Sequence, residues 1–497
     1  MRRQLRISLP LVAIAVLALG LVAVRFVRLE ADPDTSLSRS RVFYTDEGYN
    51  SCNAVSKIVT GHWLCDRNNH LLLMPVMPVL QYVTFKVAGL SLTTARLPAA
   101  VLSVVVMVLL LVLVQGRMQE EPRSSPQHKW LVLALALFLL GTNHYFFVYG
   151  RLALLDLPMT AFGLASLVLV HRALSLMSDR RSLFCFAGAG VLLATAFLTK
   201  PSAALYGTAL SVLCLLQLLV EPRRWRRLLK GMLVTLVVAG TLVLVARALL
   251  GVAAAGYREL TPAHLVTDRI VFHLRTILRN YVKFFNNPVV RKNAPLLALA
   301  YLNVVLVVFN AARSGVFRVA DRVAIALFVA CYLFLGFFVH QLPRYFVVLV
   351  VPTSYLVATL PDNLRLLCPA RRSAFCQGLF IGFALVANGW NMVHLGHYLW
   401  DPRYSMRTVA QEIRRTVGED SPGGLLCGDV AATMALSNGM RFTFGVPQQG
   451  VGAYLLSQGE ATVPGRDLVL LAKFDLLNNY RCYDYGRRMM FLYRVEE

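Results

Sequence analysis

The chain has 497 residues, 57% of them hydrophobic, with a mean hydropathy of +0.59 and a net charge of +24. Apolar stretches long enough to cross about 30 Å of hydrocarbon recur along most of the sequence, which excludes a soluble multidomain protein. The positive charge does not indicate nucleic-acid binding, because much of it lies in short clusters between apolar stretches, as the positive-inside rule describes. We therefore expect a polytopic membrane protein.

Eleven stretches are long and apolar enough to be membrane spans. The first follows Met1-Arg2-Arg3 and has no small-residue cleavage site before Arg25, so we expect a retained helix rather than a cleaved signal peptide. The eleven expected spans cover residues 7–24, 97–115, 130–149, 152–170, 183–199, 201–220, 231–250, 294–312, 323–340, 345–361 and 374–395.

A twelfth apolar stretch, residues 71–90, suits an interfacial helix better than a span because it contains Pro75, Pro78, Gln81 and Lys86. Charge favours the same interpretation. If this stretch lies on the surface and the N-terminus is inside, every strongly basic short loop faces the cytoplasm, whereas a span here would move all of these loops outside. This topology leaves three substantial pieces on the outer face, namely residues 25–96, 251–293 and the tail from about 396.

The outer segment 264–285 predicts an amphipathic helix in the headgroup layer. Its apolar residues recur at helical spacing, and Arg275, Arg279 and Lys283 share another face at i, i+4. Such a helix would either anchor the chain to anionic lipid or help to bind a phosphorylated substrate, and the sequence leaves both roles open.

The outer tail contains short β-type runs at residues 468–471 and 489–493, around turns with Gly and Asp. These runs predict a small α/β domain over residues 396–497, after a transmembrane module over residues 1–395. Four cysteines lie in the outer regions, where an oxidising compartment would favour two disulfides, Cys52–Cys65 and Cys427–Cys482. Four unpaired thiols are the alternative.

The orientation bias does not explain the charged residues at short outer turns. Arg151 precedes the fourth expected span and Asp156 lies at its entry, Lys200 lies between the fifth and sixth, and Arg344 lies between the ninth and tenth. Ionisable groups at membrane depth are costly and usually have a partner or a function. Snorkelling or an Arg151–Asp156 pair would explain one such residue, whereas three cations on one face predict a cradle for a phosphate or diphosphate.

The first outer loop supplies carboxylates. The sequence Thr45-Asp46-Glu47-Gly48-Tyr49 is typical of a helix start, with Thr45 as the cap and both acids in the first turn, where the helix dipole favours them. Capping alone would account for these acids. A carboxylate kept ionised beside a cationic site can also act as the base that deprotonates an acceptor hydroxyl.

These motifs resemble, in order and spacing, those of GT-C glycosyltransferases, and in particular the bacterial branch near the lipid A aminoarabinose transferase and the protein O-mannosyltransferases. The resemblance covers about residues 41–355 and rests on Asp46-Glu47, Ala95-Arg96-Leu97-Pro98, Arg151 with Leu155-Asp156-Leu157-Pro158, Leu198-Thr199-Lys200, and Arg344-Tyr345 with Pro352.

The resemblance implies an all-α polytopic membrane protein with a GT-C-like bundle of about eleven transmembrane helices, outer juxtamembrane helices and the small C-terminal α/β domain. It also implies a polyprenyl-phosphate-sugar donor and an inverting transfer, with Asp46 as the base and Arg151, Lys200 and Arg344 beside the donor phosphate. Relatives often have a charged residue beside a Pro-Pro pair in the interfacial segment, whereas this chain has His70-Leu71-Leu72-Leu73-Met74-Pro75-Val76-Met77-Pro78. We therefore assign no cofactor, and a divalent metal stays open.

We predict a multi-pass glycosyltransferase of the cell inner (plasma) membrane that moves a sugar from a polyprenyl-phosphate carrier to a lipid, glycan or protein on the outer face. The N-terminus would be cytoplasmic, and the C-terminal domain periplasmic or extracellular. The candidate catalytic residues are Asp46, Glu47 and Asp156, and the candidate substrate-binding residues are Tyr49, Arg151, Lys200, His340, Arg344 and Tyr345.

Two other functions would use parts of the same sequence. A transporter or flippase of a phosphorylated lipid or lipid-linked sugar would need the same cations and spans, although we find no pair of related halves of the kind that transporters often show. A non-catalytic membrane subunit with an outer interaction domain would not need outer acids and cations together. A soluble nucleotide-sugar donor has no P-loop or Gly-rich dinucleotide turn to bind it.

Overall fold

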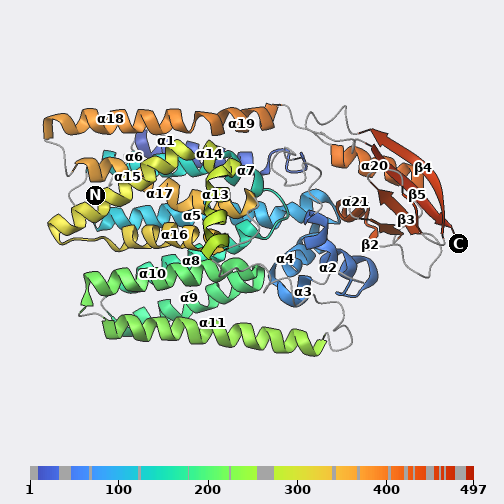
Figure 1. The fold of residues 1–497 in the computed structure, drawn as a ribbon, viewed down its shortest axis with the longest axis horizontal. Helices are drawn as coiled ribbons and strands as arrows, with labels where there is room; N and C mark the ends of the chain where they lie inside the picture. The colour runs from blue at the N-terminus through green and yellow to red at the C-terminus, as the bar shows by residue number, and fades with distance from the viewer. Residues whose placement is uncertain are drawn as a thin grey trace, which may run out of the picture.

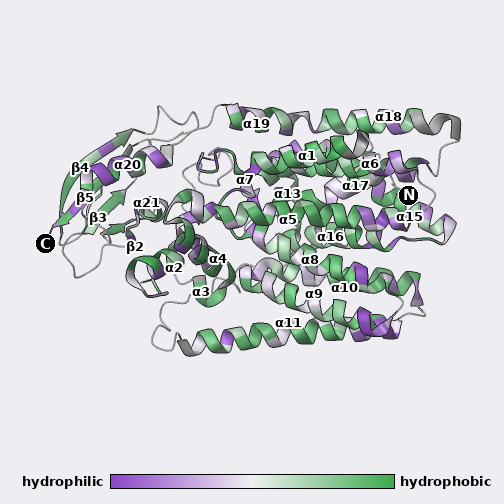
Figure 2. Ribbon diagram, turned by 180° about the vertical axis from the view of Figure 1, so that it is seen from behind, coloured by the Kyte–Doolittle hydropathy of each residue, from purple (hydrophilic) through white to green (hydrophobic). Residues whose placement is uncertain are grey.

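The computed structural model describes residues 9–32, 46–65, 70–120, 125–176, 178–222, 225–253, 274–337, 343–365, 370–400, 405–418, 424–428, 431–443, 453–457, 461–463, 466–475 and 489–496. A long bundle of helices forms most of the molecule, and a small domain with a β-sheet lies at one end of it (Figure 1). Hydrophobic residues cover the bundle helices, whereas hydrophilic residues gather at the bundle end far from the sheet (Figure 2).

Eight helices in the described part of the chain are long and apolar enough to cross a membrane. They are α5 (Leu92–Gln119), α8 (Asp156–Ser175), α9 (Asp179–Thr199), η2 with α10 (Pro201–Ala203 and Ala204–Val220), α11 (Trp225–Ala253), α15 (Ala294–Ser314), α16 (Val319–Phe337) and η5 with α17 (Pro343–Phe346 and Val347–Arg365).

Three further expected spans correspond to shorter or broken helices. Residues 7–24 lie largely in α1 (Leu9–Phe26), 130–149 are divided between α6 (Pro126–Gly141) and α7 (His144–Tyr149), and 374–395 between α18 (Ala370–Ala387) and α19 (Gly389–Trp400). The bend between α18 and α19 is 40°. Every expected span thus corresponds to a helix or a broken pair of helices, and the predicted polytopic fold is confirmed.

Asparagine side chains occupy both breaks, where backbone groups lose their helical partners. Asn143 accepts a hydrogen bond from the Phe146 amide at the start of α7, and its amide nitrogen donates to Asn293 Oδ1 at 3.0 Å. Asn391 donates to the same oxygen at 3.1 Å, and Asn388 donates to Thr142 Oγ1 at 2.7 Å. Irregular backbone at membrane depth is tolerated where protein groups bond to it, and these amides meet that requirement.

The helices that the sequence predicts on the outer face, here called the outer helices, are α2 (Asp46–Thr60), α3 (His70–Leu73), α4 (Val76–Ala88), α13 (Leu274–Asn286) and α14 (Pro288–Lys292). The 13 residues of α4 would extend about 20 Å, which is too short to cross the hydrocarbon. Helices α2, α3 and α4 lie between the bundle and the sheet, whereas α13 runs across the bundle helices (Figure 1). The interpretation of 71–90 as a surface segment agrees with this placement, and the part of the predicted amphipathic segment before 274 lies outside the described residues.

The C-terminal domain confirms the predicted small α/β unit. Its strands are β1 (Leu425–Cys427), β2 (Arg441–Thr443), β3 (Ala453–Ser457), β4 (Asp467–Asp475) and β5 (Met489–Glu496), in the order β2-β1-β3-β5-β4. Strand β1 is parallel to both neighbours, whereas β5 is antiparallel to both of its own. Helices α20 (Ser405–Val417) and α21 (Ala431–Asn438) pack with the sheet.

One hydrophobic core joins this domain to the outer helices. It includes Val55 of α2 and Phe85 of α4 together with Ile413 of α20 and Met434 of α21. Helices α2 and α21 approach so closely that a Cβ atom on Gly48 would lie 2.1 Å from the Ala432 backbone, so no larger residue fits there. The domain therefore holds in place the helix that begins at Asp46.

Candidate functional site

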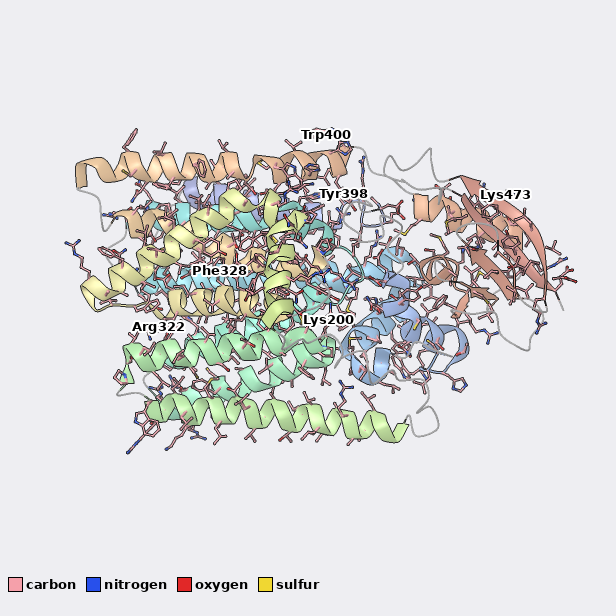
Figure 3. All side chains as sticks on the ribbon, viewed as in Figure 1. Lys200, Arg322, Phe328, Tyr398, Trp400 and Lys473 are labelled. Atoms are coloured by element: carbon pink, nitrogen blue, oxygen red, sulfur yellow. The ribbon has the colours of Figure 1, made fainter. Side chains whose placement is uncertain are left out.

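Four segments that are distant in sequence bring charged residues together at the end of the bundle nearest the sheet. Asp46 and Asp156 are the first residues of α2 and α8, where the helix dipole favours a carboxylate. Lys200 lies between α9 and η2, because Pro201 cannot continue the α9 helix, and Arg344 lies in η5. Figure 3 shows Lys200 at the junction of the bundle with the outer helices.

These four residues form a line of alternating charge, which we call the charge chain. Asp46 is ion-paired with Arg344. Arg344 Nε lies 4.0 Å from one Asp156 oxygen, and the other Asp156 oxygen accepts a hydrogen bond of 2.5 Å from Lys200 Nζ. The ring of Tyr345 lies beside both cations, with its centroid 4.4 Å from Lys200 Nζ and 5.5 Å from Arg344 Cζ. Five of the predicted site residues, the four of the charge chain and Tyr345, thus lie in one place.

The charge chain is unevenly exposed and not fully hydrogen-bonded. The Asp156 side chain is 4% exposed, those of Lys200 and Arg344 are 14% and 18% exposed, and that of Asp46 is 44% exposed. Arg344 Nε has no hydrogen-bond partner among the described residues. Arg344 therefore retains one buried donor that the described residues do not satisfy, and Asp46 is the most exposed acid of the charge chain.

An apolar pocket begins directly at the charge chain. It is a narrow crevice of about 10 Å³ between α8, α10, α16 and α17, and Asp156 and Tyr345 form part of its wall. The remainder of the wall is almost entirely apolar and consists of Met159, Ser202, Leu205, Cys331, Phe334, Leu335 and Val348. A ligand with an anionic head and a hydrocarbon tail matches this combination of charge and apolar surface.

Glu47 lies beside Asp46 but has a different environment. It is fully buried and makes a bidentate pair with Arg96 of α5, with nitrogen–oxygen distances of 2.7 and 2.6 Å. One Glu47 oxygen also accepts a hydrogen bond from the Ala153 amide at 2.8 Å, and Arg96 donates to the carbonyls of Leu29 and Ala31. This pair connects α2, α5, the segment after α1 and the segment before Asp156, which gives Glu47 an orienting position.

Arg151 and Tyr49 make their described contacts away from the charge chain. Arg151 is buried and donates to the carbonyls of Val24, Val27 and Arg28 at the end of α1. The Tyr49 ring packs at a tilt of 52° against that of Phe442 of β2, with ring centroids 5.4 Å apart. His340 lies outside the described residues. The predicted cradle of three cations is therefore represented here by two, Lys200 and Arg344.

The two sulfur atoms of the predicted disulfide Cys52–Cys65 are neighbours in the structure. The two side chains are within hydrogen-bonding reach, and this contact, together with burial, raises the pKa of Cys52 well above its ordinary value. The Asn53 side chain also contacts Cys65 Sγ at 3.7 Å. The pairing stays a prediction, and Cys482 of the second expected disulfide lies outside the described residues.

Binding of a divalent metal stays an open alternative. Within the parts of the chain that the structure describes, no group of three or more His, Cys, Asp or Glu side chains is arranged to hold a metal ion.

Sequence reasoning missed Arg96 as a partner of Glu47 and missed the apolar pocket. The run Ala95-Arg96-Leu97-Pro98 was notable only as part of a resemblance, although an arginine beside an apolar span was a signal that a buried acid had to lie nearby.

Comparisons with known proteins agree with this architecture. The model of the dolichyl-phosphate-mannose-protein mannosyltransferase family matches residues 74–250. The crystal structure of ArnT from Cupriavidus metallidurans bound to undecaprenyl phosphate has a TM-score of 0.63 at 14% identity, over 97% of this chain and 98% of that chain. The apo oligosaccharyltransferase from Archaeoglobus fulgidus has a TM-score of 0.54 at 12% identity, over 88% of this chain and 65% of that chain. No curated protein matches the chain in sequence. The predicted resemblance to GT-C glycosyltransferases and the predicted fold are confirmed.

Proposed function

We propose that this chain transfers a sugar, with inversion, from a polyprenyl-phosphate carrier to a hydroxyl acceptor on the outer face of the membrane. One observation carries the proposal: the charge chain directly borders an apolar crevice, so a phosphate head would meet cations and the start of a prenyl tail would meet apolar side chains. The relative with bound undecaprenyl phosphate supports the carrier class.

The donor phosphate binds between Lys200 and Arg344. Both cations can form charge-assisted hydrogen bonds with phosphate oxygens, and the free Nε donor of Arg344 allows a second bond from the same guanidinium. Arg344 is also paired with Asp46. Phosphate and the Asp46 carboxylate therefore compete for one guanidinium.

This competition activates the base. A carboxylate paired with arginine is held in its ionised form and is a weak proton acceptor. When phosphate takes Arg344, the Asp46 carboxylate is released from its ion pair and can accept a hydrogen bond from the acceptor hydroxyl. Asp46 is also the most exposed acid of the charge chain, so an acceptor hydroxyl can reach it from solvent.

The reaction then needs one proton acceptor and one anion site. Asp46 removes the proton from the acceptor hydroxyl while the oxygen attacks the anomeric carbon. The bond from the anomeric carbon to the phosphate oxygen breaks, and polyprenyl phosphate leaves with the electron pair. Lys200 and Arg344 stabilise the charge on the leaving phosphate, which removes the need for a general acid.

Asp156 and Glu47 position these groups. Asp156 lies between both cations and keeps them together before the donor arrives. Glu47, through Arg96 and the Ala153 amide, holds the start of α2 against the segment that leads to Asp156. Their side chains are almost completely buried, so neither is placed to accept a proton from an acceptor.

The outer face is part of the proposal. The basic short loops support a cytoplasmic N-terminus, and an odd number of spans then puts the charge chain and the sheet outside. The acceptor class, whether lipid, glycan or protein, stays open.

Turnover of a purified polyprenyl-phosphate sugar with a hydroxyl acceptor tests the proposal. Asp46→Asn keeps the shape and removes the basicity, so we expect transfer at least about a hundredfold slower, with near-wild-type expression. Retention of more than about a third of the rate, together with abolition by Asp156→Asn, would move the base to Asp156. Movement of the intact lipid-linked sugar across vesicles, without transfer, would favour a flippase instead.

A further inference from the structure

Helix α13 is held on the bundle by one of its faces. Asn280 donates to the Gly336 carbonyl at 3.1 Å, and the Tyr281 hydroxyl donates to the Tyr332 carbonyl at 3.2 Å. The approach to α16 is tight, because a Cβ atom on Gly336 would lie 2.5 Å from the Tyr281 ring. The position of α13 across α16 is thus well determined by contacts.

A second face of α13 exposes large apolar side chains. Leu278, Val282 and Phe285 are 58%, 63% and 56% exposed. At about 100° per residue these three lie on one stripe, next to the face that contacts α16. Beside this stripe lie the exposed cations Arg279 and Lys283, four residues apart on the same side. The surface of α13 therefore changes from packed to apolar to basic around its axis.

The two cations have no carboxylate to neutralise them in the described part of the chain. No ion pair is formed by either of them, and the sequences of α13, α14 and η5 contain no acid. The one acid of α16, Asp321, lies in its first turn, 15 residues or about 22 Å before Gly336. A basic stripe next to an apolar stripe matches lipid, whose phosphate and acyl chain are arranged in the same sequence.

Helix α13 also borders the charge chain. Phe284 is fully buried, and its ring centroid lies 5.2 Å from that of Phe346 and 4.8 Å from that of Tyr332. Phe346 closes η5, two residues after Arg344. Any lipid held by α13 therefore lies close to the segment that carries a donor-binding cation.

We propose that the outward surface of α13 is a binding site for anionic phospholipid, with Arg279 and Lys283 on the phosphate and Leu278, Val282 and Phe285 against the acyl chains. Charge complementarity selects this occupant, because a purely apolar partner would leave both cations without a counter-charge. The inference goes beyond the proposed transfer and does not depend on it.

Native mass spectrometry of the full chain in detergent tests this site directly, with dioleoylphosphatidylglycerol and dioleoylphosphatidylcholine as the two probes. We expect the wild-type chain to retain the anionic lipid preferentially. A surface cation contributes roughly a fivefold factor in affinity, so the Arg279→Gln, Lys283→Gln double variant should bind phosphatidylglycerol about 30-fold more weakly. No sugar or acceptor is present, so failure here is separate from failure of the proposed transfer.

A matched control removes the same charge from the C-terminal domain. Arg414→Gln with Arg415→Gln alters two exposed residues of α20 and should leave lipid binding unchanged. Equal losses in both double variants, or wild-type affinity in the α13 variant, would overturn the proposal. A wild-type dimer that becomes monomeric on Leu278→Ser, Phe285→Ser substitution would assign the face to a second copy of the chain and overturn it as well.

Discussion

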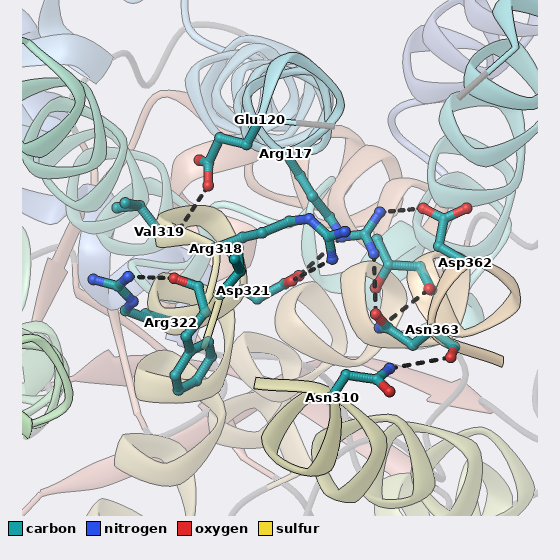
Figure 4. Close-up of polar contacts among 12 residues, drawn as sticks. Arg117, Glu120, Asn310, Arg318, Val319, Asp321, Arg322, Asp362 and Asn363 are labelled. Atoms are coloured by element: carbon teal, nitrogen blue, oxygen red, sulfur yellow. Dashed lines mark hydrogen bonds and ion pairs between the residues drawn. The ribbon is translucent and has the colours of Figure 1, made fainter. Parts of the chain in front are cut away.

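Charged residues tie helices together at both ends of the bundle, with different results. At the end far from the sheet, Arg117 of α5 bonds to Asp321 of α16 and to Asp362 and Asn363 of α17 (Figure 4). His128 of α6 pairs with the same Asp362. We call these five residues the far-end network. Figure 3 shows how far apart the two ends are, with Arg322 at one and Lys200 at the other.

The two ends differ in how many hydrogen-bond donors of the central arginine have a partner. The Arg117 side chain is 0% exposed, and its Nε and both terminal nitrogens each donate to a different partner. Arg344 is 18% exposed, and its Nε has no hydrogen-bond partner among the described residues. A buried arginine whose nitrogens all donate holds the helices together. An arginine with an unsatisfied donor at the edge of a pocket can exchange its partner. Similar residue types thus support stability at one end and chemistry at the other.

The largest expected effect is on the far-end network. Arg117→Ala would leave the buried carboxylates of Asp321 and Asp362 without their main counter-charge, which typically costs about 3–5 kcal/mol. We expect a strong loss of folded protein, measured as the thermal unfolding midpoint in detergent. An unchanged midpoint would show that Arg117 does not stabilise the fold, and the proposed difference between the two ends of the bundle would be wrong.

A disulfide between Cys52 and Cys65 would be a separate source of stability at the end of the molecule nearest the sheet. Oxidation of Cys52 and Cys65 would close a short loop behind α2 and contribute about 3 kcal/mol to stability. Peptide mapping without reductant should recover the two cysteines as one linked pair, and Cys52→Ser should lower stability only in the absence of reductant. Cys214→Ser, in α10, is the matched control and should show no dependence on reductant. Recovery of free thiols alone would end the idea.

The cations of the charge chain should affect donor binding and leave folding nearly intact. Lys200→Ala or Arg344→Ala removes a charge-assisted bond to phosphate, worth about 1.5–3 kcal/mol, so apparent donor affinity should fall roughly 10- to 100-fold. Arg407→Ala is a control, because it removes an exposed arginine–carboxylate pair with Glu30 that belongs neither to the charge chain nor to the pocket wall. Donor titrations that are unchanged in both site variants would place the phosphate elsewhere.

The sequence revealed some parts of the molecule much better than others. Spans, the surface segment 71–90 and the β-type runs of the tail follow from local hydrophobicity, so each corresponds to an element of the structure. Lys200 and Arg344 were identified because a cation at a short outer turn is costly without a role.

Pairings between distant residues were not visible in the sequence. The sequence around Arg117 gives no sign of its partners, which are 204 and 245 residues away. Arg151 carried the same local signal as Lys200, but tertiary packing directs it to backbone carbonyls at the end of α1. Glu47 and Asp46 are adjacent and chemically alike, and only the position of Arg96 separates a buried orienting group from an exposed acid.

The central claim is that Arg344 exchanges Asp46 for the donor phosphate. Binding of polyprenyl phosphate to the wild-type chain, Asp46→Asn and Arg344→Ala tests it most directly, by titration without sugar or acceptor. Removing the competing carboxylate releases a partly exposed pair worth about 0.2–1 kcal/mol, so Asp46→Asn should bind the carrier about 1.5- to 5-fold more tightly while Arg344→Ala binds it more weakly. Equal or weaker binding by Asp46→Asn would contradict the exchange.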